Sequence, residues 1–271
     1  MITVLRQKPD SSLNTVRNHL LSALPADEWQ RIRTYFKPVL LKARRILHHW
    51  NMPMEDVYFV ETGLISVVAR DESGSAIEVW IIGCEGMTGI PVVLGGGASP
   101  PHRRVVLASG AALHVSANDL RRAMAESPTL FALLLRYVQV VLMQTSQIAA
   151  CNARHSIQKR FVRWLLMAHT RLDNNDVLLT HDTLSNLLGV RRASVTKTMA
   201  NLEKAGLIGN TRGRVHVLDV QGLETAACSC YRLINAEYQR VLHERMQPDI
   251  MNLTNPGKGT ANADKRLAPI K

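Results

Sequence analysis

The sequence contains few cysteines and no long uncharged apolar run, and each shortage excludes a class of protein. Four cysteines in 271 residues, at positions 84, 151, 228 and 230, are too few for a disulfide framework, which favours free thiols in a reducing compartment. The most apolar stretch, FALLLRYVQVVLM, is too short and too polar to span a bilayer, because Arg136 and Gln139 interrupt it. The N-terminus, MITVLRQKPDSS, lacks the apolar core of a signal peptide. We therefore expect a cytoplasmic protein with no membrane partner.

The motifs that would indicate an enzyme are also missing. There is no HExxH, no GxSxG and no phosphate-binding loop with a lysine. Cys228-x-Cys230 alone is too sparse for a zinc site, so the cysteines are interpreted as ordinary buried thiols. A cupin-like metal site would need His48, His49 and His102, yet adjacent residues of a strand point to opposite faces. We expect no enzymatic activity, no cofactor and no metal.

Acidic residues are in the minority, which leaves a net charge of +11. The excess of Lys and Arg over Asp and Glu is largest in residues 152–248. A basic segment of this kind suits a polyanionic partner such as nucleic acid, although many basic faces are merely solvated.

The first half of the chain changes from helical to strand-like texture. Residues 18–36 predict two short helices, with a break at Pro25 and an acidic first turn after it. Residues 39–116 contain short β-branched runs that are separated by turn-forming residues, and these predict an antiparallel barrel, sandwich or roll. The runs are VLLKARRIL, DVYFVE, GLISVVAR, AIEVWIIG, RRVVLAS and AALHVS.

A long amphipathic helix is predicted after this region, from Pro128 to about residue 152. Ser116 can cap a short helix before it, and Ser127-Pro128 is a typical helix start. Its apolar stripe is too large for a small β-roll to cover, so we expect a second copy of the helix in a homodimer. Packing against another helix of the same chain is the alternative. The stripe comprises Phe131, Leu134, Val138, Val141, Thr145 and Ile148, flanked by Leu135, Leu142 and Ala149.

The stretch LGVRRASVTKTMANLEKAGLI, residues 188–208, predicts a helix-turn-helix. Thr180 can cap a first helix that ends at Gly189, and a second helix from about Arg192 places Val195, Met199 and Leu202 on one side. The following LIGNTRGRVHVLD predicts a two-stranded wing. The opposite face of the second helix offers cations to the major groove of DNA, and the wing offers cations to the phosphates. The alternative is a helical pair whose basic face is only solvated. The predicted DNA-binding residues are Arg191, Arg192, Ala193, Ser194, Thr196, Lys197, Arg212 and Arg214.

The chain resembles the Crp/Fnr family of bacterial transcription regulators over about residues 20–220. The resemblance is carried by the stretch TLSNLLGVRRASVTKTMANLEKAGLI and the wing after it, which follow a β-rich domain and a long helix. The resemblance implies a cyclic-nucleotide-binding-like β-roll, a dimerising helix, a winged helix-turn-helix, and RNA polymerase as a further candidate partner. Arg192, Ala193 and Lys197 match the base-reading positions of the family. The middle position is commonly acidic in the family, so the usual target sequence is not implied for this chain.

The effector site of the family is matched only in part. In cyclic-AMP binders the phosphate cassette resembles Gly-Glu-Leu, and its glutamate holds the ribose hydroxyl. This chain has Gly89 followed by Ile90, so that carboxylate is missing. Arg103 or Arg104 remains available for an anion, and Thr145 and Ser146 fall near the base-contacting positions of the dimer helix. These hydroxyls can instead bond within their own helix. An effector other than cyclic AMP is expected, and the absence of cysteine before position 84 disfavours an iron–sulfur sensor of the Fnr kind.

The expected protein is thus an α+β homodimeric regulator that binds an inverted-repeat operator in double-stranded DNA. The alternative is a ligand-binding or scaffold protein whose basic domain contacts another protein. The predicted segments are an N-terminal extension (1–17), a β-roll sensor (18–127), a dimerisation helix (128–152), a winged helix-turn-helix (153–222), a C-terminal helix (223–247) and a disordered tail (248–271).

Overall fold

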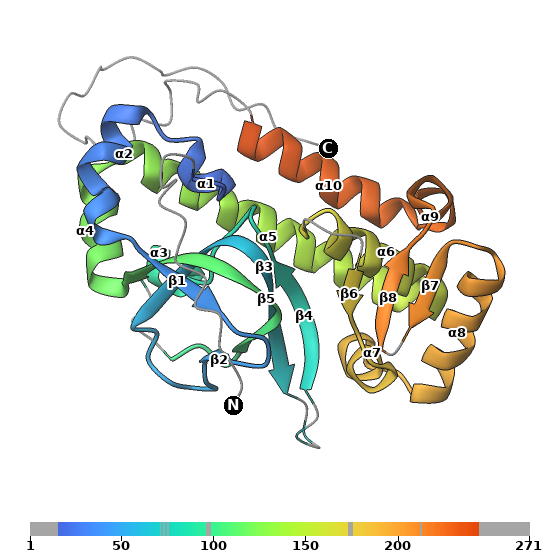
Figure 1. The fold of residues 1–271 in the computed structure, drawn as a ribbon. Coiled ribbons are helices and arrows are strands. Elements are labelled where there is room, and N and C mark those ends of the chain that lie inside the picture. Colours follow the sequence, from blue (N-terminus) through green and yellow to red (C-terminus); the bar gives the residue numbers. More distant parts are fainter. Residues whose placement is uncertain are drawn as a thin grey trace, which may run out of the picture.

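A β-roll and a winged-helix unit lie at the two ends of one long helix in the computed structural model (Figure 1). The structure describes residues 16–243 apart from 71, 73, 75, 96–98, 173–175 and 212. Most of the predicted N-terminal extension and all of the predicted tail lie outside these residues. The α+β architecture and the order of the predicted units are confirmed.

The two short N-terminal helices are present where Pro25 separates them. They are α1 (His19–Ser22) and α2 (Ala26–Ile32), and a 3₁₀ helix η1 (Arg33–Tyr35) follows. Asp27 and Glu28 stand in the first turn of α2, where acidic side chains complement the helix dipole.

The roll is an antiparallel sheet in which the strand order is β1-β5-β3-β4 and β2 also pairs with β5. Six sequence runs become five strands because the first run is divided and two pairs of runs each join, one pair through Thr62 and Gly63 and the other through Gly110. A Cβ at Gly110 would lie 2.1 Å from the Thr62 carbonyl oxygen, so glycine lets two long strands approach each other closely. The first run is divided by a turn at residues 42–45. The elements are β1 (Lys37–Leu41), β2 (Ile46–His48), β3 (Asp56–Arg70), β4 (Ala76–Ile82), α3 (Ile90–Val93) and β5 (Arg103–Ser116).

Serine caps start the next two helices, as predicted. Ser116 accepts a hydrogen bond from the Asp119 amide at 3.0 Å and begins α4 (Ala117–Glu126). Ser127 accepts from the Leu130 amide at 3.1 Å and begins α5 (Pro128–Arg154). These local bonds satisfy amides that have no partner within the helix.

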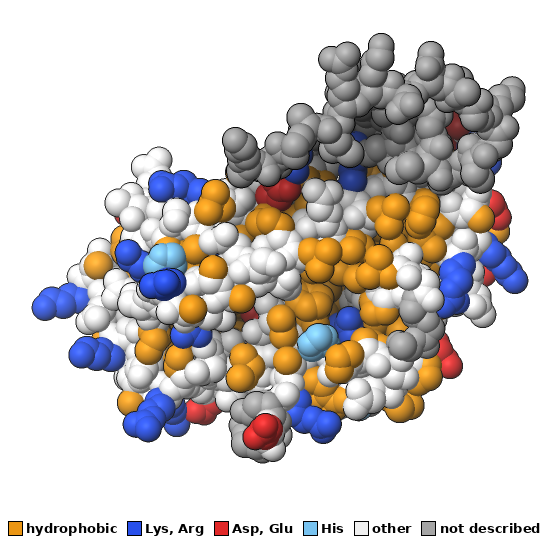
Figure 2. All heavy atoms as spheres, turned by 180° about the vertical axis from the view of Figure 1, so that it is seen from behind, with side chains coloured by type: hydrophobic (Ala, Val, Ile, Leu, Met, Phe, Trp, Pro, Cys, Tyr) orange, Lys and Arg blue, Asp and Glu red, His pale blue; other side chains and the backbone are white. Residues whose placement is uncertain are grey.

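The apolar stripe of α5 divides into a buried face and an exposed face. Leu134, Val138 and Val141 are buried within their own chain, so the intrachain alternative is right for this part of the stripe. Figure 2 shows hydrophobic side chains gathered across the middle of the face opposite to that of Figure 1. The exposed face of α5 follows the spacing 4-3-4-3 of a coiled-coil seam. We call this the α5 seam: Leu135, Gln139, Leu142, Ser146 and Ala149.

Among the described helices, only α5 is long and apolar enough to cross a membrane, so the expectation that its apolar stretch is too short and too polar for this is wrong by length and composition. Half of its most apolar stretch is buried inside the structure, as in the core helix of a globular protein. Its apolar residues are therefore explained by packing within the chain and by the α5 seam.

The C-terminal part contains a small three-stranded sheet, ordered β6-β8-β7, among helices. The predicted C-terminal helix over 223–247 is present from Ser229 to His243, but its start is misplaced, because the chain turns at Ala227 and Cys228 and residues 223–226 belong to a separate short helix. The elements are α6 (Ile157–His169), β6 (Asp176–Leu178), α7 (His181–Leu188), α8 (Arg192–Lys204), β7 (Ile208–Thr211), β8 (Arg214–Val217), α9 (Val220–Ala226) and α10 (Ser229–His243).

Candidate nucleic-acid interface

The turn between α7 and α8 has the geometry that the sequence predicts. Thr180 caps α7 by accepting a hydrogen bond from the Thr183 amide at 3.1 Å. Gly189 ends α7 in the left-handed region at φ 62°, a conformation that favours glycine. The next residue, Val190, donates its amide to the Ser185 carbonyl at 3.0 Å, which closes the turn.

One face of α8 is locked to the domain core and the other is open. Val195, Met199 and Leu202 are each 1% exposed, as predicted for the packing side. The predicted reading residues lie on the other side, where only Ser194 is half-buried. Those that are exposed are Arg191, Arg192, Ala193, Thr196 and Lys197. A helix held this way presents a basic outer face of small and charged residues.

Arg192 forms an ion pair with a residue of the preceding helix. Its Nε lies 3.3 Å from Oδ1 of Asp182, and both side chains are about two-thirds exposed, at 67% and 68%. An exposed pair of this kind contributes little to stability, roughly 0–1 kcal/mol. The guanidinium can therefore exchange the carboxylate for a nucleic-acid acceptor at small cost.

His181 is an interface residue that the sequence analysis missed. Its Nδ1 lies 3.0 Å from the Thr196 hydroxyl on α8, and its Nε2 lies 3.5 Å from the Asn210 amide nitrogen on β7. The first residue of α7 thus links the reading helix to the wing. No local pattern marks this role, because the three residues are far apart in sequence.

The wing is present as the antiparallel pair β7 and β8, with Gly213 at φ 78° in the turn between them. Arg214 is exposed at the start of β8, whereas Arg212 lies outside the described residues. Figure 2 shows Lys and Arg side chains along its left edge, the side on which α8 and the wing lie. The helix face and the wing thus present positive charge on the same side of the molecule.

The roll contacts the winged-helix unit through β4. Glu78 accepts hydrogen bonds from the Ser66 hydroxyl at 2.5 Å and from the indole Nε1 of Trp164 on α6. Burial raises the pKa of Glu78 to about 7, and the hydrogen bonds from Ser66 and Trp164 oppose that rise. A Cβ at Gly189 would lie 3.6 Å from Ile77 of β4, so the helix-turn-helix turn packs against the sensor sheet. A change in β4 can therefore reach α7 and the turn before α8 by direct contact.

Of the candidate effector residues, Arg104 has the most unusual environment. It is 2% exposed, its Nη1 donates to the His102 carbonyl at 2.7 Å, and its Nε has no hydrogen-bond partner. Burial lowers the pKa of Arg104 to about 10. Its cross-strand neighbour Val67 belongs to the apolar cluster inside the roll. Arg104 therefore offers unused donor capacity in the interior of the sensor.

The other candidate effector residues have ring, packing or hydrogen-bond contacts, although the Nε of Arg103, like that of Arg104, is buried without a hydrogen-bond partner. The Arg103 guanidinium stacks over Trp50 at 4.9 Å from the ring centroid. A Cβ at Gly89 would meet Val57 at 2.7 Å, so this glycine is required by packing. The Thr145 and Ser146 hydroxyls donate to carbonyls of their own helix, Thr145 to Val141 and Leu142 at 3.0 Å each and Ser146 to Leu142 at 2.9 Å. The intrahelical alternative therefore describes both hydroxyls in this structure.

Two further buried polar atoms in the roll were not predicted. They are His48 Nδ1 and Trp80 Nε1, and neither has a hydrogen-bond partner. Burial lowers the pKa of His48 to about 4, which keeps the imidazole neutral. His49 is exposed while His48 is buried, as the strand argument required. Among the described residues, His48, His49 and His102 do not gather into a group that could hold a metal ion.

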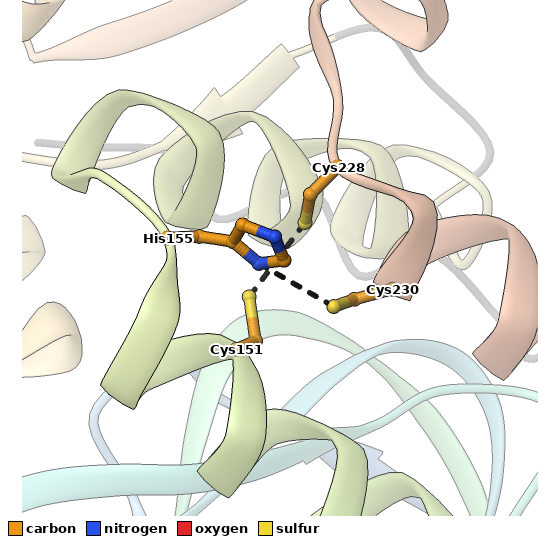
Figure 3. A group of neighbouring side chains, drawn as sticks. All are labelled: Cys151, His155, Cys228 and Cys230. Atoms are coloured by element: carbon orange, nitrogen blue, oxygen red, sulfur yellow. Dashed lines mark hydrogen bonds between the residues drawn. The ribbon is translucent and has the colours of Figure 1, made fainter.

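Three of the four cysteines are buried, as predicted, but they are not isolated from one another. Cys151, Cys228 and Cys230 are 0%, 5% and 1% exposed, whereas Cys84 is partly exposed. Cys228-x-Cys230 is not an isolated pair, because Cys151 and His155 lie beside it (Figure 3). Cys228 and Cys230 are close in sequence, but the other two candidate ligands come from a distant part of the chain.

Comparison with known proteins agrees with this geometry. Residues 159–226 match the model of the Crp-like helix-turn-helix domain. The chain is 23% identical over 214 residues to the global nitrogen regulator of Nostoc sp., which covers 75% of this chain and 91% of that protein. It is 26% identical over 184 residues to the transcriptional regulator SdrP of Thermus thermophilus, which covers 65% and 85%. The structure of FixK2 from Bradyrhizobium japonicum has the same fold, with a TM-score of 0.61 and 16% identity over 71% of this chain and 98% of that one.

Proposed function

We propose that this chain is a transcription regulator of the Crp/Fnr type that acts as a homodimer in the cytoplasm on an inverted-repeat operator. The family consists of regulators rather than enzymes, so the chemistry of interest is recognition. RNA polymerase is a further partner of this proposal.

The outer face of α8 carries the proposal of sequence-specific reading. Arg192 and Lys197 are exposed on it, five residues apart, next to the small Ala193 and Ala200. Small residues let a helix approach the floor of the major groove, where Arg can bind guanine through two hydrogen bonds. Arg214 of the wing holds phosphate beside the groove.

The α5 seam is the proposed dimer contact. Leu142 is 64% exposed and Leu135 39%, although leucine favours burial and Leu134, Val138 and Val141 of the same stripe are buried in their own chain. A second copy of α5 related by a two-fold axis would place the two seams against each other and bury both leucines. The same axis would present the two α8 helices to consecutive major grooves.

Arg104 is the proposed effector contact, for an anion other than cyclic AMP. It is a buried guanidinium, and no carboxylate of the described residues forms an ion pair with it. The position after Gly89 is Ile90, so a ribose hydroxyl would lack the charge-assisted hydrogen bond, about 1.5–3 kcal/mol, that a carboxylate supplies.

Replacing Arg104 by Met should make the effector-free protein more stable by about 1–3 kcal/mol, because an uncompensated buried charge is replaced by an apolar chain of similar length. Inorganic phosphate should raise the urea midpoint of the original chain and leave that of Arg104→Met unchanged. Arg103→Met, which alters a guanidinium stacked on Trp50, is the control and should keep the response to phosphate. Equal stabilisation of both variants by phosphate, or calorimetry showing sub-micromolar cyclic AMP binding, would contradict the effector proposal.

Selection of bound sequences from random duplex DNA tests the proposed function as a whole. The enriched sequences should form an inverted repeat whose half-sites are about one DNA turn, roughly 34 Å, apart. The scaffold alternative predicts no enriched sequence and no steep dependence of DNA retention on salt, since counterion release accompanies phosphate binding. Enrichment of a single unpaired half-site would disprove the dimer on an inverted repeat.

A further inference from the structure

Three cysteines and one histidine from distant parts of the chain meet where α5 ends and α10 begins (Figure 3). Cys151 lies in the last turn of α5 and His155 is the residue after that helix. Cys228 precedes α10 and Cys230 lies in its first turn. The four candidate ligand atoms, three Sγ and one imidazole nitrogen, all lie within 4.8 Å of one another.

Two of the distances between these atoms are those expected between ligands of one tetrahedral metal ion. Cys151 Sγ lies 3.6 Å from Cys228 Sγ, and Cys230 Sγ lies 3.6 Å from His155 Nδ1. With Zn–S near 2.3 Å and Zn–N near 2.0–2.1 Å, a tetrahedral ion sets S···S at about 3.8 Å and S···N at about 3.5 Å. We propose that Cys151, His155, Cys228 and Cys230 bind one Zn²⁺ ion through three thiolates and one imidazole.

The backbone brings each pair of ligands to the same side. Cys151 and His155 are four residues apart at the end of α5, and the His155 amide still donates to the Cys151 carbonyl at 2.9 Å. His155 itself has φ −103° and ψ 147°, so the chain leaves the helix at this residue. Cys228 and Cys230 bracket the start of α10, which packs along α5.

The polar groups around the cluster are a hydrogen-bond donor and a cation, which suit negatively charged thiolates. Gln147, one turn before Cys151 on α5, donates its Nε2 to Cys230 Sγ at 3.1 Å. Arg163 is 4% exposed, its Nε has no hydrogen-bond partner, and among the described residues it forms no ion pair with a carboxylate. Three thiolates, one imidazole and Zn²⁺ carry a net charge of −1, which the guanidinium beside Cys151 balances.

Other roles for the cluster fit less well. A redox-sensing cysteine is accessible to oxidants, whereas Cys151, Cys228 and Cys230 are 0%, 5% and 1% exposed. An iron–sulfur cluster places several irons among its ligand sulfurs and so sets them further apart than one ion does. Soft thiolates with an imidazole, closed on all four sides by protein, are typical of structural zinc.

The site would fasten the end of the dimer helix to the segment that follows the wing. Cys151 and His155 lie at the end of α5, before the winged-helix unit begins. Cys228 and Cys230 follow β8 and α9, at the end of that unit, so the ion would join the two ends of the winged-helix unit. This inference goes beyond the proposed function, since metal binding is measured without DNA.

Metal analysis of the full-length chain, purified under reducing conditions, tests the proposal. We expect one zinc per chain in the original protein and in Cys84→Ser, whose thiol lies outside the cluster and contacts His19. Cys230→Ser and His155→Ala should each lose most of the zinc. Replacing zinc by Co²⁺ should give the intense visible absorption of a tetrahedral cobalt site and a sulfur-to-cobalt charge-transfer band.

His155→Cys keeps the test decisive if the other variants fail to fold. A fourth thiolate should retain one metal per chain and raise the cobalt charge-transfer intensity by about a third, from three sulfurs to four. Any of four results would overturn the proposal: less than a tenth of a metal per chain in the original protein with no cobalt spectrum, unchanged zinc in a folded Cys230→Ser, iron with labile sulfide, or a Cys151–Cys228 disulfide in the metal-free native chain.

Discussion

Leu142→Asp is expected to convert the protein into folded monomers. Leu142 is 64% exposed in the single chain, so a charge there leaves the core of each chain intact. In the proposed dimer the two-fold axis would bury both aspartates in the α5 seam, where like charges and lost hydration each oppose association. Sedimentation should show the monomer mass with unchanged circular dichroism.

Loss of the dimer should lower affinity for the inverted repeat by about 10²–10⁴-fold, because the second half-site is then no longer bound at high effective concentration. Leu40→Asp makes the same change at another exposed leucine, 72% exposed on β1, and should leave the dimer and its DNA affinity intact. A Leu142→Asp protein that keeps the dimer mass would show that α5 does not form the interface.

The same substitution one turn earlier should have a different result. Val138 is 6% exposed and belongs to the main core cluster, so Val138→Asp places an unpaired charge inside its own chain. We expect loss of the folded state rather than a clean monomer. The contrast between Leu142 and Val138 separates the dimer contact from the core of the chain.

These faces of α5 show what the sequence can and cannot specify. Spacing of three and four predicted a long amphipathic helix, and the capping serine at 127 predicted its start, because both signals are local. The choice of which face the chain covers depends on the roll and on α10, which lie elsewhere in the sequence. The predicted stripe was therefore right as a helix pattern, and only its exposed part remains available for the proposed dimer contact.

The helix-turn-helix could be predicted because its signals are close together in sequence. The cysteine cluster could not, because its members are far apart in sequence. Thr180, Gly189 and the apolar face of α8 are neighbours in sequence, and each acts on the backbone within a few residues. Cys151 and Cys228 are 77 residues apart and meet only because α10 folds back along α5. A search for cysteine and histidine four residues apart near a helix end would have marked Cys151 and His155 as a candidate half-site.

Arg192→Ala and Arg214→Ala are expected to weaken DNA binding in two different ways. Arg192 leads the exposed face of α8, so its loss should cost about 1–3 kcal/mol for each half-site of the selected sequence and relax the preference at one base pair. Arg214 lies on the wing, so its loss should weaken binding to every duplex alike and reduce the salt slope by about one unit. Fluorescence anisotropy on the selected and a scrambled duplex, over a range of salt, measures both effects.

Asp182→Asn is the matched control for Arg192, because it removes the ion pair between Asp182 and Arg192 and leaves the guanidinium in place. Stability should change by less than about 1 kcal/mol, as for exposed ion pairs. DNA affinity should stay the same or increase, because a negative charge near the phosphates is lost. If Asp182→Asn and Arg192→Ala reduce affinity equally, the ion pair positions α8 and Arg192 does not read a base. If Arg192→Ala and Arg214→Ala lower affinity alike on both duplexes, α8 contributes only charge and the protein binds DNA without reading its sequence.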